Sequence, residues 1–284
     1  MQIFDFKNDF VFKYVFGEER NEKLLISLLN ALLRLEGPDK ITWISILNPF
    51  NQKEFVESKL SIVDVKAKDG LERQFNIEVQ MESEPGYVPR VLFYWAKLFS
   101  QQLEEGKKYT ALSKTTSISI LNYVLFPKEP RMENIFQLRQ IETHAELTDL
   151  LDVRFLDLKK FSPQKPKNLR SVFEKWLYAL KFGELYAAED SSLPNELSSE
   201  EGIAMAIQEL RKINADRELR QILEARSKEA HTRATIIADA EERGMAKGRE
   251  EERHELARKL LKRGMTIPEV CDITGLPENE IKRS

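Results

Sequence analysis

The sequence predicts an α/β fold, with a mixed β-sheet flanked by helices and an all-α C-terminal region. Three observations predict it. Between residues 41 and 161, several segments alternate apolar and polar residues, as β-strands with one buried face do. Before and between these segments, apolar residues recur every three or four positions, as in amphipathic helices. After residue 200 only the helical spacing continues, with a high density of charge.

The first predicted elements are two helices between residues 5 and 34. Aromatic residues recur at four-residue spacing, Gly17 interrupts the run, and LLISLLNALLRL predicts a second helix that packs inward. Asp9 and Lys13 lie one helical turn apart, so both can face the same pocket. An Asp at a helix start also commonly serves as a cap, so Asp9 has two explanations.

The stretch from Leu60 to Gln80 predicts a β-hairpin, because two alternating runs flank a turn at Lys68–Gly70. Since side chains alternate along a strand, Glu78 and Gln80 project from the same face. On the preceding strand, Asp64 interrupts an otherwise apolar row. That placement is costly, because a charge removed from water must be hydrogen-bonded, paired or bound to a metal.

Two explanations of these acids remain open. If the two strands are neighbours, Asp64 and Glu78 can converge on a hard divalent cation, with Gln80 beside them to orient a water or a phosphate. Alternatively, the acids form an exposed strand pair matched to Lys66 and Arg73. Alternation alone favours neither explanation.

The remaining elements follow from the same patterns. We expect strands at 41–49, 115–126, 133–142 and 153–161, and helices at 91–106 and 171–183. The helix at 91–106 is expected to end at Gly106. At its start, Arg90 and Tyr94 can reach a phosphate, with Lys97 one turn further, unless all three belong to an ordinary amphipathic surface.

Composition limits the classes of function. The net charge is −3, so any contact with DNA must come from a local basic patch. The single cysteine, Cys271, excludes an internal disulfide and a cysteine-cluster metal site and fits a reducing cytoplasm. The histidines lack metal-ligand spacing, and no phosphate-binding glycine motif occurs. We expect no signal peptide and no membrane span, because no uncharged apolar run approaches about 18 residues.

We expect a domain at 1–186, a linker at 187–200 and a helical C-terminal region at 201–284. Most residues of the linker are small, polar or acidic, and one is a proline. The helical region is expected to form a homo-oligomer with a second copy. A shorter product started at an internal methionine would hold only this region and bind the full-length protein as a regulator.

The end of the chain predicts a small helix-turn-helix-like bundle. A helix ends at Gly264, Thr266 and Glu269 form a capping box for the next helix, and Gly275 stops that helix. Basic residues nearby favour a DNA reader. The short, half-acidic segment PENEIKRS offers few donors to base edges and instead favours oligomerisation or a protein partner.

An Asp, a short hairpin and Glu-x-Gln on the next strand resemble the core of PD-(D/E)xK nucleases, with Gln80 where most members have lysine. The motifs NDFVFKYVFG, KLSIVDVKAKDG, FNIEVQ and LLKRGMTIPEVCDITGLPENEI, in this order, are similar to the Rpn family. These are bacterial recombination-promoting nucleases, also described as transposases of the PD-(D/E)xK type. The resemblance spans nearly the whole chain, and four motifs in order make it specific.

The resemblance implies a restriction-endonuclease-like core and a Mg²⁺- or Mn²⁺-dependent endonuclease that acts on double-stranded DNA. Asp64 and Glu78 would bind the metal together with the backbone carbonyl of Val79. Asp9 would approach as an additional acid. The helix at 91–106 would pack behind the active site.

The resemblance also implies DNA contacts from Lys66, Lys13 and Arg90. Gln80 cannot supply a positive charge, so it can orient the water or donate to a phosphate oxygen but cannot offset developing negative charge as lysine does. A rival hypothesis is a nuclease scaffold without turnover that acts as a DNA-binding or regulatory module. True transposition would need a second catalytic domain, which the sequence does not reveal.

Overall fold

The computed structural model describes residues 3–49, 64–103, 105–163, 165–188 and 190–281. The chain forms two compact units, Met1–Leu223 and Glu224–Ser284. The strands are β1 (Ile44–Ile46), β2 (Val65–Asp69), β3 (Gln74–Gln80), β4 (Thr115–Leu121), β5 (Glu133–Phe136) and β6 (Leu151–Asp157). The helices are α1 (Asp9–Phe16), α2 (Glu22–Leu33), α4 (Tyr87–Ser100), α5 (Val172–Phe182), α6 (Asn195–Ser198), α7 (Glu201–Ala215), α8 (Arg217–Lys262), α9 (Ile267–Thr274) and α10 (Glu278–Ile281).

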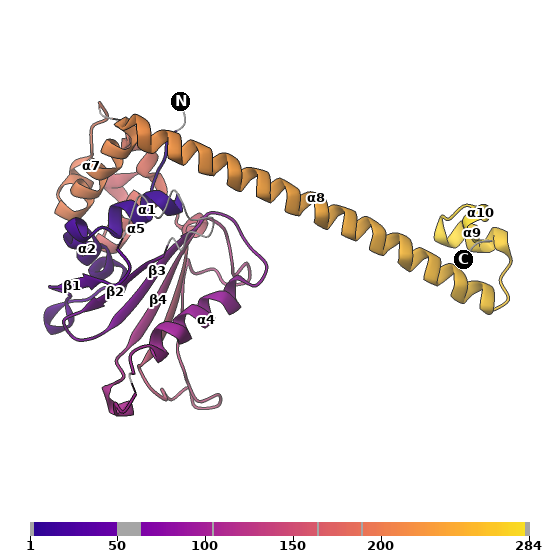
Figure 1. The fold of residues 1–284 in the computed structure, drawn as a ribbon, viewed down its shortest axis with the longest axis horizontal. Coiled ribbons are helices and arrows are strands. Elements are labelled where there is room, and N and C mark those ends of the chain that lie inside the picture. The colour runs from indigo at the N-terminus through magenta and orange to yellow at the C-terminus, as the bar shows by residue number, and fades with distance from the viewer. Residues whose placement is uncertain (1–2, 50–63, 104, 164, 189, 282–284) are drawn as a thin grey trace. The chain divides into compact units, whose positions relative to one another are not determined.

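A six-stranded sheet in the order β1-β2-β3-β4-β6-β5 forms the centre of the first unit (Figure 1). Strands β3, β4 and β6 run parallel, and the other neighbours pair antiparallel. This mixed sheet with its flanking helices confirms the predicted fold class. Strands are present at the predicted positions, but their ends differ from the prediction: β4 ends at Leu121 and β5 at Phe136, and β6 begins at Leu151 and ends at Asp157.

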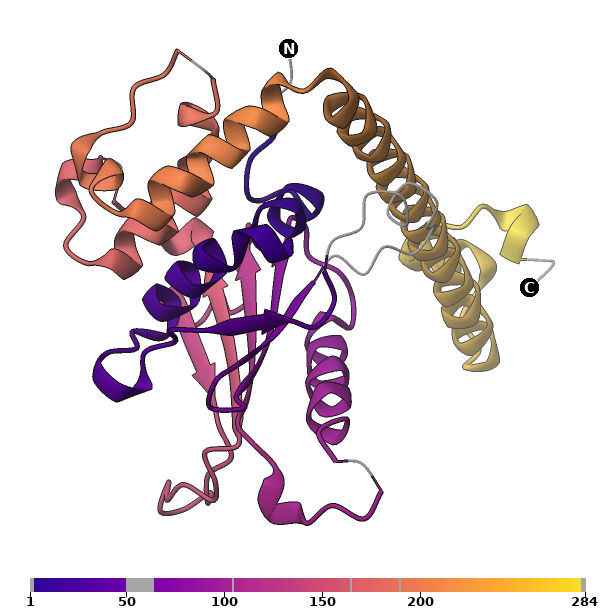
Figure 2. The ribbon, with the colours of Figure 1, turned by 60° about the vertical axis from the view of Figure 1, so that its left-hand side comes forward.

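Different helices cover the two faces of the sheet (Figure 2). Helices α1, α2, α5 and α7 pack on one face, where the main core includes Phe75, Ile77 and Val79 of β3. On the other face, Tyr87 and Val91 of α4 pack against β4 and β6. The even-numbered residues of β3 therefore point toward α4, because side chains alternate along a strand.

The turn between β2 and β3 lies later than the sequence predicts. Strand β2 continues through Asp69, and the turn occupies residues 70–73. Asp69 is buried, and its Oδ1 accepts hydrogen bonds from the backbone N–H groups of Leu71 and Arg73 at 3.0 and 2.9 Å. Its Oδ2 pairs with Arg73 Nε at 2.6 Å. The carboxylate organises the turn from within, so Asp69 belongs to the strand end. Leu60 and Ile62 of the predicted strand lie outside the described residues.

The boundary between the two units also lies later than the predicted linker. Residues 187–200 contain α6, which buries Leu197 in the main core. The apolar stripe of α7 packs into the same core, and α8 begins there with Leu219 and Leu223 buried. The polar composition of 187–200 therefore indicates a surface connection within the first unit.

The second unit contains the end of α8 with α9 and α10, and Val270, Leu276 and Ile281 pack with Ala257. The helix ends expected from the sequence are present in this unit. Glu269 accepts a hydrogen bond from the backbone N–H of Thr266 at 2.8 Å. Gly275 ends α9 in the left-handed conformation with a φ of 68°, which glycine adopts without a steric penalty.

Candidate active site

The β2–β3 register brings Asp64 and Glu78 opposite each other. Val65 pairs with Ile77 in antiparallel register, so the next pair outward is Asp64 and Glu78. Both acids project from the face that α4 covers, whereas Val65 and Ile77 lie in the main core on the opposite face. The two acids therefore share one face of the sheet, fourteen positions apart in the sequence.

Asn48 holds the backbone that directly follows the Asp64 side chain. Its Nδ2 donates to the carbonyl of Asp64 at 3.0 Å, and its Oδ1 accepts from the N–H of Lys66 at 2.7 Å. The Asp64 side chain is buried, and its Oδ1 has no hydrogen-bond partner among the described residues. A buried carboxylate oxygen without a donor carries a desolvation penalty that a bound cation would remove.

Two hydroxyl groups hold the carboxylate of Glu78. Tyr87 Oη donates to Glu78 Oε1 at 2.7 Å, and Ser119 Oγ donates to the same oxygen at 3.3 Å. Burial raises the pKa of Glu78, and the charge of Asp64 adds to this effect. The hydrogen bonds from Tyr87 and Ser119 and the positive charge of Arg90 oppose the rise in the Glu78 pKa without cancelling it. The site thus holds two nearby acids, and one of them is hard to ionise.

Gln80 points from the same face of β3 and is held by Arg90 of α4. Arg90 Nη2 donates to Gln80 Oε1 at 3.2 Å, while Nη1 pairs with Glu84 Oε2 at 2.6 Å. Because a guanidinium carries only donors, the amide atom that faces it must be the oxygen. The Nε2 group of Gln80 therefore points away from Arg90 and keeps its two N–H donors for another partner.

Lys66 lies beside Asp64 on the same face of β2. Its Nζ is 3.4 Å from Asp64 Oδ2 and 5.8 Å from the centre of the Tyr94 ring. The ion pair and the aromatic face together keep the ammonium at the carboxylate. The structure thus places a cation one strand away from Gln80, whose own side chain has no charge.

Helix α4 lies over the site, whereas the sequence analysis placed this helix behind it. Tyr87, Arg90 and Tyr94 are three and four residues apart, and each contacts a different strand residue of the site. Lys97 is exposed on α4.

Helix α4 begins at Tyr87, four residues before the predicted start at residue 91, so Tyr87 was missing from the predicted site. In the structure, Gly86 adopts a φ of 76° just before the helix, and Pro89 lies in the first turn, where its missing N–H costs nothing. Proline shortly after glycine was the available signal for a helix that starts at Tyr87. The expected end at Gly106 is also wrong, because α4 ends at Ser100.

Comparison with known families agrees with this geometry. The family model of PD-(D/E)XK nuclease family transposases matches residues 6–240. The chain belongs to this family. The matched range includes the whole sheet and ends within α8, before α9 and α10. No curated protein and no solved structure gives a significant match. The resemblance seen in the sequence is therefore confirmed at the level of the family.

The site contains oxygen atoms of the chemical type that binds a hard divalent cation. The carbonyl of Gln80 accepts a hydrogen bond from Asn122 on the β4 side at 2.9 Å. Since carbonyls alternate along a strand, the carbonyl of Val79 points toward the β2 side, where Asp64 lies. Two carboxylates and a carbonyl are oxygen donors suited to Mg²⁺ or Mn²⁺, which retain water in their other positions. The unpartnered Oδ1 of Asp64 also fits such an ion.

Asp9 and Lys13, the two N-terminal residues expected at the site, are not placed as the sequence predicts. Asp9 is exposed in the first turn of α1, and its Oδ1 accepts from the N–H of Phe10 at 2.7 Å. Among the described residues, no three His, Cys, Asp or Glu side chains gather to hold a metal, so Asp9 does not complete such a group with the two strand acids. The cap of α1 is Asn8, not Asp9. Lys13 is buried beside Gly17, close to Val65.

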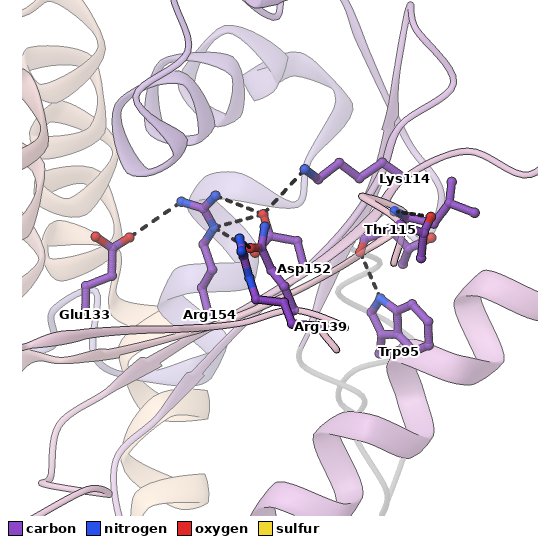
Figure 3. A network of polar contacts seen from close by, with 10 residues as sticks. Trp95, Lys114, Thr115, Glu133, Arg139, Asp152 and Arg154 are labelled. Carbon is purple, nitrogen blue, oxygen red and sulfur yellow. Dashed lines mark hydrogen bonds and ion pairs between the residues drawn. The ribbon is translucent and has the colours of Figure 1, made fainter. Parts of the chain in front are cut away.

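Another buried carboxylate, Asp152 of β6, is an example of an acid that is fully paired with basic side chains. Arg154 Nη2 lies 2.8 Å from Asp152 Oδ2, and Lys114 Nζ lies 3.9 Å from the same oxygen (Figure 3). Arg154 also reaches Glu133 of β5 at 3.6 Å (Figure 3). Paired in this way, Asp152 ties β6 to its neighbours. Among the described residues, Asp64 Oδ1 has no donor, and neither oxygen of Asp157 accepts a hydrogen bond, although Lys160 lies 3.0 Å from Asp157 Oδ2.

In the part of the chain that the structure describes, no helix combines the length and the apolar character that a membrane span requires.

Proposed function

We propose that this member of the PD-(D/E)XK nuclease family transposases is a Mg²⁺- or Mn²⁺-dependent endonuclease that cuts double-stranded DNA. The observation that carries the proposal is the pair Asp64 and Glu78 on one sheet face, with Asp64 Oδ1 buried and without a donor among the described residues. A buried pair of acids of this kind is unfavourable without a cation.

Each residue of the site has a proposed role. Asp64, Glu78 and the carbonyl of Val79 hold the metal. The bound metal supplies Lewis acidity toward the scissile phosphate and lowers the pKa of an attacking water. Gln80 directs its Nε2 donors at that water or at a phosphate oxygen, since Arg90 occupies its Oε1.

Positive charge comes from neighbouring residues. Lys66 is ion-paired with Asp64 and would become available to a phosphate oxygen if Asp64 held a metal. Arg90 adds a second cation behind Gln80. These cations stand in for the lysine that most relatives place at the position of Gln80. Lys13, expected to contact DNA, is buried beside Gly17 and does not add to this basic surface.

Incubation of the purified full-length protein with supercoiled plasmid tests the proposal. Nicked and linear products should appear with Mg²⁺ or Mn²⁺, disappear with a chelator, and be absent with Asp64→Ala. Cleavage by Asp64→Ala at the wild-type rate would remove the proposed mechanism.

A second candidate function is a nuclease scaffold that binds DNA or regulates without turnover. Gln80 in place of lysine favours it, because the motif lacks its own cation. Metal-independent DNA binding without nicking in either metal would support this alternative. Strand-transfer products would be needed to assign transposition.

The second unit is proposed to join two copies of the chain rather than to read DNA. Its last helix, α10, begins with Glu278 and carries Glu280, which offer no donors to base edges. Sedimentation of the full-length protein, compared with a chain that ends after Leu223, should show loss of the oligomer. A short form that starts at Met205, Met245 or Met265 would compete for the same contacts.

A further inference from the structure

Tyr87 is the first residue of α4 and is buried beside the candidate metal site. Its ring packs edge-on against Tyr123 and Phe155, with centroids 6.4 and 6.3 Å apart, and the guanidinium of Arg90 lies 5.1 Å from its centre. The ring is thus fixed by the next turn of its own helix, by β6 and by the loop after β4. Its hydroxyl consequently has a defined position at Glu78 Oε1, 2.7 Å away.

The direction of this hydrogen bond is determined by the chemistry of the two groups. Burial raises the pKa of the Tyr87 hydroxyl far above its ordinary value, and the charge of Glu78 raises it further. The phenol therefore keeps its proton and donates. Ser119 Oγ donates to the same oxygen at 3.3 Å. Among the described residues, no donor reaches Oε2 of Glu78.

We propose that Tyr87 is a positioning residue that makes Glu78 a one-oxygen metal ligand and thereby selects Mg²⁺ or Mn²⁺ over Ca²⁺. This inference rests on the proposed metal site. With Oε1 held by two hydroxyl groups, only Oε2 is available to a cation. A small octahedral ion accepts one oxygen from a carboxylate, whereas Ca²⁺ tolerates two and takes more ligands.

The matched pair Tyr87→Phe and Tyr123→Phe tests the inference. Both variants remove one hydroxyl from the same aromatic cluster and keep the ring. The hydroxyl of Tyr123 is buried without a hydrogen-bond partner among the described residues, so its loss removes no hydrogen bond from Glu78. The affinities of the chelator-treated full-length protein for Mn²⁺ and for Ca²⁺ are measured by calorimetry at constant pH, and thermal unfolding verifies the fold.

Tyr87→Phe should lose about 10- to 100-fold in Mn²⁺ affinity, the usual effect of removing a partner of a metal ligand. Its Ca²⁺ affinity should fall less, because the freed Oε1 allows two-oxygen ligation. Tyr123→Phe should match the wild type for both ions. If Tyr87→Phe does not fold, Ser119→Ala provides the same test with a smaller expected shift.

The outcomes separate this inference from the proposed function. If the wild type binds Mn²⁺, Asp64→Ala does not, and Tyr87→Phe equals the wild type, the positioning role is overturned and the metal site stands. Equal losses for both ions in Tyr87→Phe would assign Tyr87 a purely structural role and overturn the selection of Mn²⁺. Absence of Mn²⁺ binding by the wild type overturns both.

Discussion

Arg90 Nη2 donates a hydrogen bond to Gln80 Oε1 at 3.2 Å, so a helix residue sets the orientation of the amide in the Glu-x-Gln motif. Arg90 is itself held by Glu84 at 2.6 Å. The charge that the motif lacks is therefore supplied from α4, and the amide presents its N–H groups toward the site.

Gln80→Glu should abolish the donor and keep the contact with Arg90. The new carboxylate would form an ion pair with the guanidinium, so the free energy of unfolding should be unchanged or higher. DNA nicking should fall by about 10²- to 10³-fold, as for the loss of one donor to a developing negative charge. Plasmid cleavage and urea unfolding measure the two effects. Full activity in Gln80→Glu would show that the amide N–H groups are not needed.

Asp64→Asn should separate metal binding from stability. The substitution keeps the shape of the side chain but removes one of the two acids that face each other across β2 and β3. After chelator treatment, Asp64→Asn should be as stable as the wild type or more stable, because the substitution removes the repulsion between Asp64 and Glu78. Calorimetry should detect no Mn²⁺ binding. Stabilisation of Asp64→Asn by Mn²⁺ equal to that of the wild type would contradict the assignment.

Lys66→Gln should weaken DNA binding, whereas Lys68→Gln should not. The two lysines lie on the same face of β2, but Lys66 is 3.4 Å from Asp64 and Lys68 is ion-paired with Glu72 at 2.9 Å. If Lys66 contacts one phosphate, its removal should reduce the slope of log affinity against log salt by about 1. Fluorescence anisotropy in Mn²⁺, with a labelled duplex whose linkages cannot be cleaved, measures this slope. Equal slopes for both variants would exclude a special role of Lys66.

Stability should depend on pH through the cluster of Asp5, Lys7 and Glu184. Burial raises the pKa of Asp5 to about 7, and its hydrogen bond with Glu184 contributes, although Lys7 lies 2.6 Å away. The folded state binds this proton more tightly than the unfolded chain, whose carboxyl has a pKa of 3.8. The stabilisation is complete below pH 3.8 and is lost as the pH rises to about 7.

Asp5→Asn should remove that decline, because an amide donates to Glu184 at every pH. Glu184 does not offset the effect in this window, since its pKa is lowered from 4.5 and its contribution is lost only on further acidification. Urea unfolding between pH 4.5 and 8 compares the two proteins. Parallel pH profiles would show that Asp5 does not hold the proton.

Much of the fold could be predicted from local patterns. The alternation in FNIEVQ placed Glu78 and Gln80 on one face, and β3 confirms it. The stops at Gly264 and Gly275 and the capping box of Thr266 and Glu269 are also present. These features depend on residues a few positions apart, so the sequence contains all the partners that produce them.

Other features depend on partners that local patterns do not identify. The turn lies after Asp69 because its buried carboxylate binds two N–H groups of the turn, which composition alone does not show. The predicted linker at 187–200 is a surface connection within the first unit. The helix that follows it, α7, buries its apolar residues in the core that α1 and α2 also form.

The sequence by itself determined the type of most elements, the face from which the motif residues project and the family. Only the tertiary structure decided that Asp64 lies opposite Glu78, that α4 covers the site, and that Tyr87 and Arg90 hold the motif side chains. The physical reason is the distance along the chain over which each interaction acts. Periodicity and capping act over one or two turns, whereas strand register and the docking of a helix depend on the packing of the whole core.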